Sequence, residues 1–324
     1  MSLKIAVVGT NFISDAFCDA AKQLDDVFVT AVYSRKLDTG AAFAQKHGIK
    51  TVYESFDEML ADEEIGAVYI ASPTFTHKEL AIRAMTAGKH VLCEKSISVT
   101  LDEFLQMKRA SGEAGVVLLE AMRPAFDPLM SILKEQLSRL GQVRSAGLEF
   151  CQYSRRYDGF KSGILTNAFD PKMKNSALTD IGIYPLHIAV SLFGEPISLS
   201  ASSTFLHNGF EGEGEVRLDY QSFEARISYS KVRQGENISQ IECEGGILCF
   251  DKPNAPSSIA LTDKSGALTR LSYEPTENNM VYEIAAFRDM IEGRKSHLPY
   301  LSVTEKVMRT VDRIYEAAGI KFPE

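Results

Sequence analysis

A strand, a sharp turn and a helix are predicted at the start of the chain, and this order constrains the fold more than any other feature. Residues 4–8 form a short apolar run, typical of a strand buried on both faces. Gly9 follows at once, and from Asn11 onward the apolar residues take helical spacing. Because the N–H groups and dipole of a helix N-terminus favour anions, the turn is a candidate phosphate site.

The turn keeps only part of the glycine pattern that binds dinucleotides. Instead of Gly-x-Gly-x-x-Gly the chain reads GTNFIS from Gly9, so only the glycine of the tight turn remains. We expect Asn11 to replace the second glycine, because asparagine tolerates a left-handed backbone, and Ser14 to permit close helix–strand packing. An ordinary first turn of an α/β protein is the alternative. The cofactor contacts expected here are Gly9, Thr10, Asn11, Phe12 and Ile13.

Strand-like and helix-like segments alternate over the first third of the chain, which predicts a doubly wound parallel sheet, the Rossmann fold. Ligands bind such sheets at the carboxyl ends of the strands, so the residues that follow each strand are candidates for a site. The expected strands are 27–33, 51–53, 67–71, 90–93 and 116–119, and the expected helices are 39–47, 56–61, 77–87 and 101–114.

The loop after the second strand indicates which dinucleotide is bound. NAD enzymes usually carry an acidic residue here for the ribose hydroxyls, but this chain has Ser34, Arg35 and Lys36 before its first acid, Asp38. A hydroxyl and a guanidinium suit a 2′-phosphate, so Ser34 and Arg35 favour NADP over NAD. A merely solvated loop is the alternative.

Two further loops carry candidates for the nicotinamide end of the cofactor. Ser72, Pro73, Thr74 and His77 follow the strand at 67–71, where the proline should stop the strand and Thr76 could cap the next helix. His77 could also simply close the first turn of that helix.

Glu94 and Lys95 follow the strand at 90–93. Charges at the end of a buried strand are costly without partners. A partly buried lysine can donate a proton or act electrostatically, and a surface ion pair is the alternative.

Several stretches together resemble the Gfo/Idh/MocA family, named for glucose-fructose oxidoreductase, inositol dehydrogenase and a rhizopine catabolism protein. The most specific is AGKHVLCEK at 87–95, in which the family's Glu-Lys-Pro motif assigns the catalytic lysine to Lys95; here Ser96 replaces the proline. The resemblance implies a Rossmann domain over residues 1–122 and a substrate-binding domain over 123–324. The other matching stretches are 9–13, 71–73 with His77, 120–122 with Pro128, 180–184 and 315–319.

Three polar residues share one predicted helical face in the second half. Asp180, Tyr184 and His187 lie at i, i+4 and i+7, with Pro185 placing the helix start near Gly182. Simple exposure to solvent is the alternative. Tyr184, where many relatives have histidine, resembles the glucose-fructose oxidoreductase and dimeric dihydrodiol dehydrogenase branches, which implies NADP and a tyrosine acid.

As a hypothesis for the mechanism, we assign roles in hydride transfer to these residues. Lys95 and Tyr184 would exchange a proton with the substrate oxygen, and Asp180 would orient or charge-balance Lys95. His187 could relay a proton or hold a substrate hydroxyl. Arg123 could reach the substrate, although an ion pair near the crossing between domains is equally expected of it.

Short alternating runs recur from residue 197 to residue 271 and predict a mainly antiparallel open sheet, followed by helices at 280–292 and 303–318. The second domain is therefore of the α+β class. An open sheet with one exposed face can pair with its twin, so we expect a homodimer or a higher homo-oligomer through this sheet.

Charge and composition exclude several classes of function. The net charge of −8 leaves no basic stripe for nucleic acid. No apolar run approaches the length of a membrane span, and we expect no signal peptide. The five cysteines are odd in number and lack metal-ligand spacing, which favours reduced thiols in the cytoplasm and no metal site.

The sequence thus predicts an NAD(P)-dependent oxidoreductase. It would transfer hydride between nicotinamide, preferably of NADP, and a small molecule: a sugar, a polyol or a related cyclic alcohol or ketone. The altered glycines and Ser96 leave one alternative from another class, a dinucleotide-binding regulator or sensor without catalysis.

Overall fold

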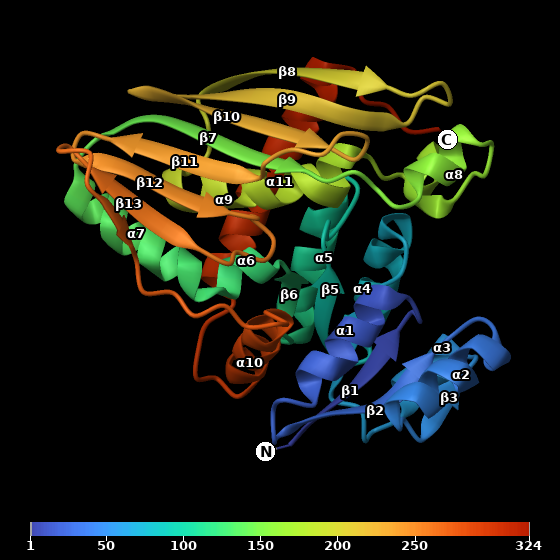
Figure 1. The fold of residues 1–324 in the computed structure, drawn as a ribbon. Coiled ribbons are helices and arrows are strands. Elements are labelled where there is room, and N and C mark those ends of the chain that lie inside the picture. The colour runs from blue at the N-terminus through green and yellow to red at the C-terminus, as the bar shows by residue number, and fades with distance from the viewer. Residues whose placement is uncertain (1, 324) are drawn as a thin grey trace. The chain divides into compact units, whose positions relative to one another are not determined.

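The computed structural model describes residues 2–323 and divides the chain into two compact units (Figure 1). The first unit contains the residues up to Met122 together with Glu277–Ser302, and the second contains Arg123–Thr276 together with the residues from Val303 onward. The first crossing thus lies between Met122 and Arg123, and a later segment of the chain returns to the first unit.

The first unit is built on a six-stranded parallel sheet, which confirms the predicted Rossmann fold. The strand order is β3-β2-β1-β4-β5-β6, so the direction of winding reverses between β1 and β4. This reversal is where such sheets bind their ligands. The strands are β1 (Leu3–Val8), β2 (Val27–Tyr33), β3 (Thr51–Tyr53), β4 (Ala67–Ile70), β5 (His90–Glu94) and β6 (Leu118–Ala121).

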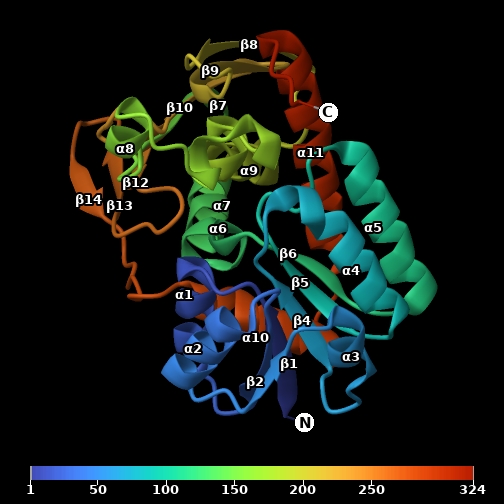
Figure 2. The same cartoon turned by 90° about the vertical axis from the view of Figure 1, so that its right-hand side faces the viewer.

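Helices cover both faces of this sheet, with α1 and α2 on one face and α4 and α5 on the other (Figure 2). The last strand begins two residues later than predicted, because Val117 N donates to His90 Nδ1 (2.9 Å) before the strand starts. The helical segments are α1 (Phe12–Ala21), α2 (Leu37–His47), α3 (Phe56–Ala61), η1 (Thr74–Thr76), α4 (His77–Thr86) and α5 (Leu101–Ala114).

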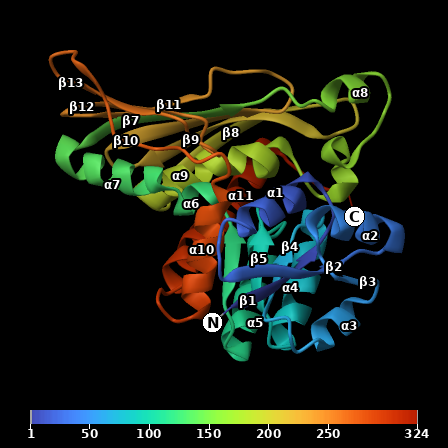
Figure 3. The same ribbon diagram turned by 60° about the horizontal axis from the view of Figure 1, so that its bottom comes forward.

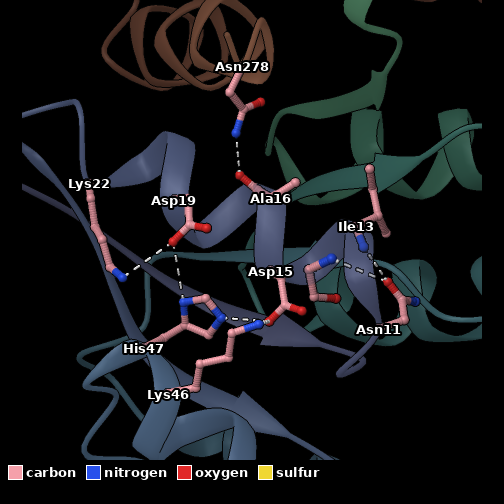
Figure 4. A network of polar contacts seen from close by, with 10 residues as sticks. Asn11, Ile13, Asp15, Ala16, Asp19, Lys22, Lys46, His47 and Asn278 are labelled. Atoms are coloured by element: carbon pink, nitrogen blue, oxygen red, sulfur yellow. Dashed lines mark hydrogen bonds and ion pairs between the residues drawn. The ribbon is translucent and has the colours of Figure 1, made fainter.

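The returning segment contains α10 (Met280–Ile291), which packs against α1. Asn278 Nδ2 donates to Ala16 O at 2.7 Å (Figure 4). Arg288 forms an ion pair with Asp26 at 2.7 Å. Residues 277–302 therefore pack with the first unit, although the predicted second domain included them. Their apolar spacing is that of an ordinary amphipathic helix and does not show which unit the helix packs against.

The second unit is built on an eight-stranded sheet in the order β14-β13-β12-β11-β7-β10-β9-β8. Among the residues that the structure describes, only β10 and β7 of this sheet pair in parallel, which confirms a mainly antiparallel sheet. The strands are β7 (Val143–Cys151), β8 (Ser198–Phe205), β9 (Glu211–Tyr220), β10 (Phe223–Ser230), β11 (Ile238–Cys243), β12 (Gly246–Asp251), β13 (Ile259–Asp263) and β14 (Leu268–Arg270).

Helices α7 and α9 lie on one face of this sheet (Figure 3). Along β11, buried and exposed residues alternate, so the other face carries exposed side chains such as Gln240 and Glu242. Within residues 2–323, no helix has the length and apolar character needed to cross a bilayer. The remaining helical segments are α6 (Arg123–Phe126), α7 (Pro128–Leu140), α8 (Tyr157–Lys161), η2 (Asn167–Phe169), η3 (Pro171–Met173), η4 (Leu178–Gly182), α9 (Ile183–Phe193) and α11 (Leu298–Ala318).

Candidate active site

The turn after β1 requires glycine at position 9. Gly9 has φ +109°, and a Cβ there would lie 2.6 Å from the carbonyl oxygen of Ala71, which follows β4. Real Cβ atoms do not approach so closely, and the positive φ is itself unfavourable for other residues. Gly9 therefore lets the first turn lie directly against the end of the neighbouring strand.

Asn11 caps α1 instead of taking a left-handed conformation, so that expectation is wrong. Its backbone is extended (φ −92°, ψ 178°), and its Oδ1 accepts from Ile13 N at 2.9 Å and Ser14 N at 3.2 Å (Figure 4). Its Nδ2 donates to Ala71 O at 2.7 Å. Satisfying the first N–H groups of the helix outweighs any gain from a glycine-like turn.

The other residues of this turn differ sharply in exposure. Ser14 is fully buried, and its Oγ lies 3.7 Å from the position of a Cβ on Gly9, as close packing between helix and strand requires. Phe12 is 68% exposed at the first position of α1. A large apolar side chain exposed beside this candidate phosphate site is a candidate contact for a bound cofactor.

The loop after β2 leads directly into a helix N-terminus. Ser34 Oγ donates to Lys36 O at 2.9 Å and lies 3.3 Å from Lys36 N, so this hydroxyl shapes the loop. Lys36 is the N-cap of α2 and makes no side-chain capping bond, while Arg35 is exposed. The earlier start of α2, at Leu37, adds a helix dipole to the two cations.

The loop after β4 is held by hydroxyls and by a buried histidine. Thr76 occupies the N-cap position of α4, but its Oγ1 donates to Pro73 O (2.8 Å) and pairs with Ser72 Oγ (2.7 Å), so the expected capping bond is absent. His77 is 1% exposed; its Nε2 lies 2.8 Å from Ser72 O and its Nδ1 3.1 Å from Ser96 O. Burial lowers the pKa of His77. His77 thus links the loops that follow β4 and β5.

Glu94 orders the end of β5 beside Lys95. Tyr69 Oη donates to Glu94 Oε1 at 2.6 Å, and Lys95 N lies 3.2 Å from Glu94 Oε2. On the next strand, Glu120 Oε1 accepts from Ile97 N at 3.1 Å. The peptide bond between Lys95 and Ser96 is cis. Two buried carboxylates thus fix the backbone on either side of this loop.

In the second unit, the segment that carries Asp180 and Tyr184 begins with one π-helical turn, η4, before α9. Gly182 is the N-cap of α9, as Pro185 predicts. A Cβ on Gly182 would lie 2.7 Å from the ring of Tyr229, so this segment rests directly on β10. Glu211 Oε2 accepts from Leu178 N at 3.0 Å and holds its first turn.

Asp180 pairs with Lys231, which no sequence pattern indicated as a site residue. Its Oδ2 lies 2.7 Å from Nζ of Lys231, and the side chains are 40% and 4% exposed. Lys231 follows β10, and nothing in a strand pattern distinguishes a buried lysine there from an exposed one.

His187 and Tyr184 are both buried in α9, which excludes the alternative that they simply face solvent. His187 Nδ1 lies 3.2 Å from Ser191 Oγ, and burial together with nearby Lys134 lowers the pKa of His187 to about 3. The Tyr184 ring packs edge-on against Phe150, with centroids 5.8 Å apart. His187 therefore stays neutral at ordinary pH.

The sequence-predicted residues divide between the two units. The first unit holds the cofactor candidates and Lys95, and the second holds Asp180, Tyr184, His187 and Arg123, the first residue of α6. Within residues 2–323, no three His, Cys, Asp or Glu side chains gather as a metal site. The meeting of Lys95 and Tyr184 at one substrate stays a prediction.

Comparisons with known proteins find a family match in each of the two units. Residues 3–122 match a family described as an oxidoreductase family with an NAD-binding Rossmann fold, and residues 135–248 match the GFO/IDH/MocA C-terminal domain. The chain is 39% identical over 293 residues to the scyllo-inositol 2-dehydrogenase (NADP(+)) IolU of Bacillus subtilis, covering 90% of this chain and 89% of that protein.

More distant relatives cover almost the whole chain. The trans-1,2-dihydrobenzene-1,2-diol dehydrogenase of Mus musculus is 26% identical, over 100% of this chain and 99% of that protein. Among solved structures, KijD10, a 3-ketoreductase from Actinomadura kijaniata in complex with NADP and TDP-benzene, superposes with a TM-score of 0.88. It is 20% identical and covers 98% of both chains, which shows a shared fold.

Proposed function

The chain belongs to the Gfo/Idh/MocA family of oxidoreductases, and from this premise we propose that it interconverts a ring hydroxyl and a ketone on a cyclic polyol or sugar with NADP(H). The observation that carries the proposal is the Gly9 turn, pressed against Ala71 between β1 and β4 of a Rossmann sheet. The substrate class is favoured because IolU, at 39% identity, is named for a cyclic polyol and for NADP(+).

The first unit offers groups that fit each part of the dinucleotide. The turn of Gly9, Thr10 and Asn11 would hold the pyrophosphate at the start of α1, and Phe12 and Ile13 would contact the cofactor beside it. Arg35, at the uncapped N-terminus of α2, would bind the 2′-phosphate, with Ser34 shaping that loop. NAD, which lacks this phosphate, should bind more weakly.

The loops after β4 and β5 would hold the nicotinamide end. Ser72, Pro73 and Thr74 would line it, and His77 and Glu94 would support it through the hydrogen bonds described above. The nicotinamide accepts a hydride during oxidation of the substrate and donates one during reduction. The protein must supply the path for the accompanying proton.

Lys95 and Tyr184 are the proposed proton partners. In oxidation the substrate hydroxyl gives its proton to this pair as the C–H bond breaks, and in reduction the pair returns it. Asp180 would charge-balance the site, and Arg123 would contact the substrate. His187, which stays neutral, would hold a substrate hydroxyl through a hydrogen bond.

One experiment tests the proposal. Thermal shift with NADP(H) and NAD(H) should show a larger stabilisation by NADP(H), and a panel of inositols, aldoses and dihydrodiols should reveal turnover. Lys95→Met should keep NADP affinity and lose turnover by about a thousandfold. Full turnover by Lys95→Met would refute the assignment, and NADP binding without turnover of any compound would favour the non-catalytic regulator.

We further propose that the chain forms a homodimer through the exposed face of the eight-stranded sheet. That face carries charges of both signs, and Arg226 Nε lies 3.2 Å from Glu215 Oε1 across neighbouring strands. Two copies of such a face can pair their opposite charges. Arg226→Glu should dissociate the dimer in sedimentation velocity, whereas Arg139→Glu, on α7, should not.

The cysteines support a reducing compartment. All five are free thiols, and four of them are buried. Disulfides are rare in the cytoplasm, where we place the protein.

A further inference from the structure

Lys231, which lies outside the motifs that match the family, forms an ion pair with Asp180. We propose that Lys231 is a positioning residue for the reaction, which keeps the Asp180 carboxylate ionised and fixed in direction. This inference rests on the proposed function, in which Asp180 balances the charge of the catalytic pair.

The backbone of Lys231 is fixed on both sides. Lys231 N donates to Gly212 O at 2.9 Å, at the start of β9, and Lys231 O accepts from Ser154 N at 2.9 Å. These bonds tie the residue after β10 between a strand and the segment that follows β7. These two bonds therefore hold the backbone from which the Lys231 side chain extends.

The ammonium group is enclosed by groups that favour a cation. Lys231 Nζ donates to Ala168 O at 2.7 Å and lies 2.7 Å from Asp180 Oδ2. It also lies 4.9 Å from the ring centroid of Phe169 and 5.0 Å from that of Phe210, so two aromatic faces contact it. A buried ammonium without such partners would be neutralised or excluded.

The aromatic rings belong to a packed cluster and are not free to move with the lysine. Phe169 and Phe210 are fully buried, with ring centroids 5.2 Å apart, and Phe160 stacks on Phe169 at 5.3 Å. Ala168 and Phe169 belong to the long segment between β7 and η4. Lys231 thus connects that segment to Asp180 through one cation.

The two partners are exposed to very different extents, and this asymmetry indicates the role. The Lys231 side chain is 4% exposed, whereas that of Asp180 is 40% exposed. An ion pair that served only stability would gain little from burying one charge and leaving the other at the surface. A buried ammonium group that binds one side of a more exposed carboxylate instead fixes the direction of that carboxylate. The carboxylate can then interact with a second group on its exposed side.

The test compares Lys231→Met, Lys231→Arg, Asp180→Asn and the double variant Lys231→Met/Asp180→Asn. We expect Lys231→Met to lower kcat/KM by about tenfold or more, to move the acidic limb of its pH profile upward, and to leave the Kd for NADP nearly unchanged. Lys231→Arg, which keeps the charge, should recover part of the activity. Arg139→Met removes an exposed cation of α7 that pairs with Glu135 at the same 2.7 Å, and should change nothing.

The double variant separates positioning from other effects. If Lys231 acts through Asp180, adding Lys231→Met to Asp180→Asn should cause no further loss, and removing both charges should also restore a fold that the single variant weakens. Additive losses, or a normal pH profile for Lys231→Met while Asp180→Asn is impaired, would overturn the inference alone. Full activity of Asp180→Asn would overturn both this inference and the proposed role of Asp180.

Discussion

Tyr69 Oη donates a 2.6 Å hydrogen bond to Glu94 Oε1; both residues are buried, and Glu94 immediately precedes Lys95. The Tyr69 ring also stacks on Phe17, with centroids 3.7 Å apart, so phenylalanine can fill the same space. The hydroxyl itself therefore orders the carboxylate whose other oxygen lies against Lys95 N.

Tyr69→Phe should lower the free energy of unfolding by about 1–3 kcal/mol, because a buried carboxylate loses a donor. Since the backbone of Lys95 is held by the same carboxylate, kcat should also fall while NADP affinity stays. Urea denaturation and steady-state kinetics measure the two effects. The control is Tyr53→Phe, which removes a comparable 2.8 Å bond to Asp62 at a less buried site and should have a smaller effect.

Gly9→Ala should abolish the stabilisation by NADP in a thermal-shift assay. The added Cβ would meet Ala71 O at 2.6 Å at a φ of +109°, so the turn must move away from β4. The strain should cost about 1–3 kcal/mol before any clash is counted. Gly48→Ala provides the comparison, because Gly48 also has a positive φ but no atom within 4 Å of the added Cβ. A Gly9→Ala protein with unchanged NADP affinity would contradict the phosphate site.

Arg35→Ala should weaken NADP binding by about 10–100-fold, as expected for the loss of a charge-assisted hydrogen bond to phosphate. NAD binding should hardly change, because NAD lacks the 2′-phosphate, and the same variant therefore contains its own control. Isothermal titration with both cofactors measures the ratio. Equal weakening of NADP and NAD would mean that Arg35 supports the fold of the loop and does not read the phosphate.

The strands and helices were predictable where one residue pattern dominates. The strand at 51–53 and the helices at 56–61 and 101–114 have the predicted bounds, because Ser55 and Thr100 cap helices whose apolar spacing is regular. The three residues of β14 are all exposed and carry no such pattern. The local residue pattern thus predicts helices and strands that have a buried face, but it does not predict a short, exposed edge strand.

The contacts of the candidate site were less predictable. The identity of Asn11 is compatible with both a left-handed turn and an N-cap, and only the nearby Ile13 N, Ser14 N and Ala71 O decide between them. Lys231 lies 51 positions after Asp180 in the sequence, so only the folded sheet brings them together. Side-chain partners that are distant in sequence leave no periodic signal.

Asp15 should stabilise the first unit in a pH-dependent way. Burial acts to raise its pKa, but hydrogen bonds from His47 (2.7 Å) and Lys46 (2.8 Å) outweigh it and hold the pKa of Asp15 below its usual value (Figure 4). A lowered pKa in the folded state stabilises the protein above the unfolded pKa, and this contribution disappears as pH falls through the folded pKa.

Asp15→Asn should therefore cost about 1–2 kcal/mol at pH 7, and the difference from wild type should shrink below about pH 4. Urea denaturation at several pH values measures this, with the exposed Asp25→Asn as the control. A difference that stays constant down to pH 3 would mean that packing, and not ionisation, carries the effect.

His187 should destabilise the fold in mild acid. Its pKa is lowered to about 3 in the folded protein by burial and by Lys134, whereas an unfolded histidine titrates near 6.5. Below that value the unfolded chain binds a proton that the folded chain does not, so stability should fall by about 1.4 kcal/mol per pH unit from this residue. His187→Gln should reduce that slope between roughly pH 6 and pH 4.

The same variant tests how His187 takes part in the reaction. Because a neutral imidazole does not titrate in the working range, the pKa values seen in the kcat/KM profile of His187→Gln should match those of wild type, while KM rises if the imidazole holds a substrate hydroxyl. His207→Gln, at an exposed histidine of the same unit, should change neither the stability slope nor KM. Loss of a limb of the profile in His187→Gln would instead show that this side chain exchanges a proton during turnover.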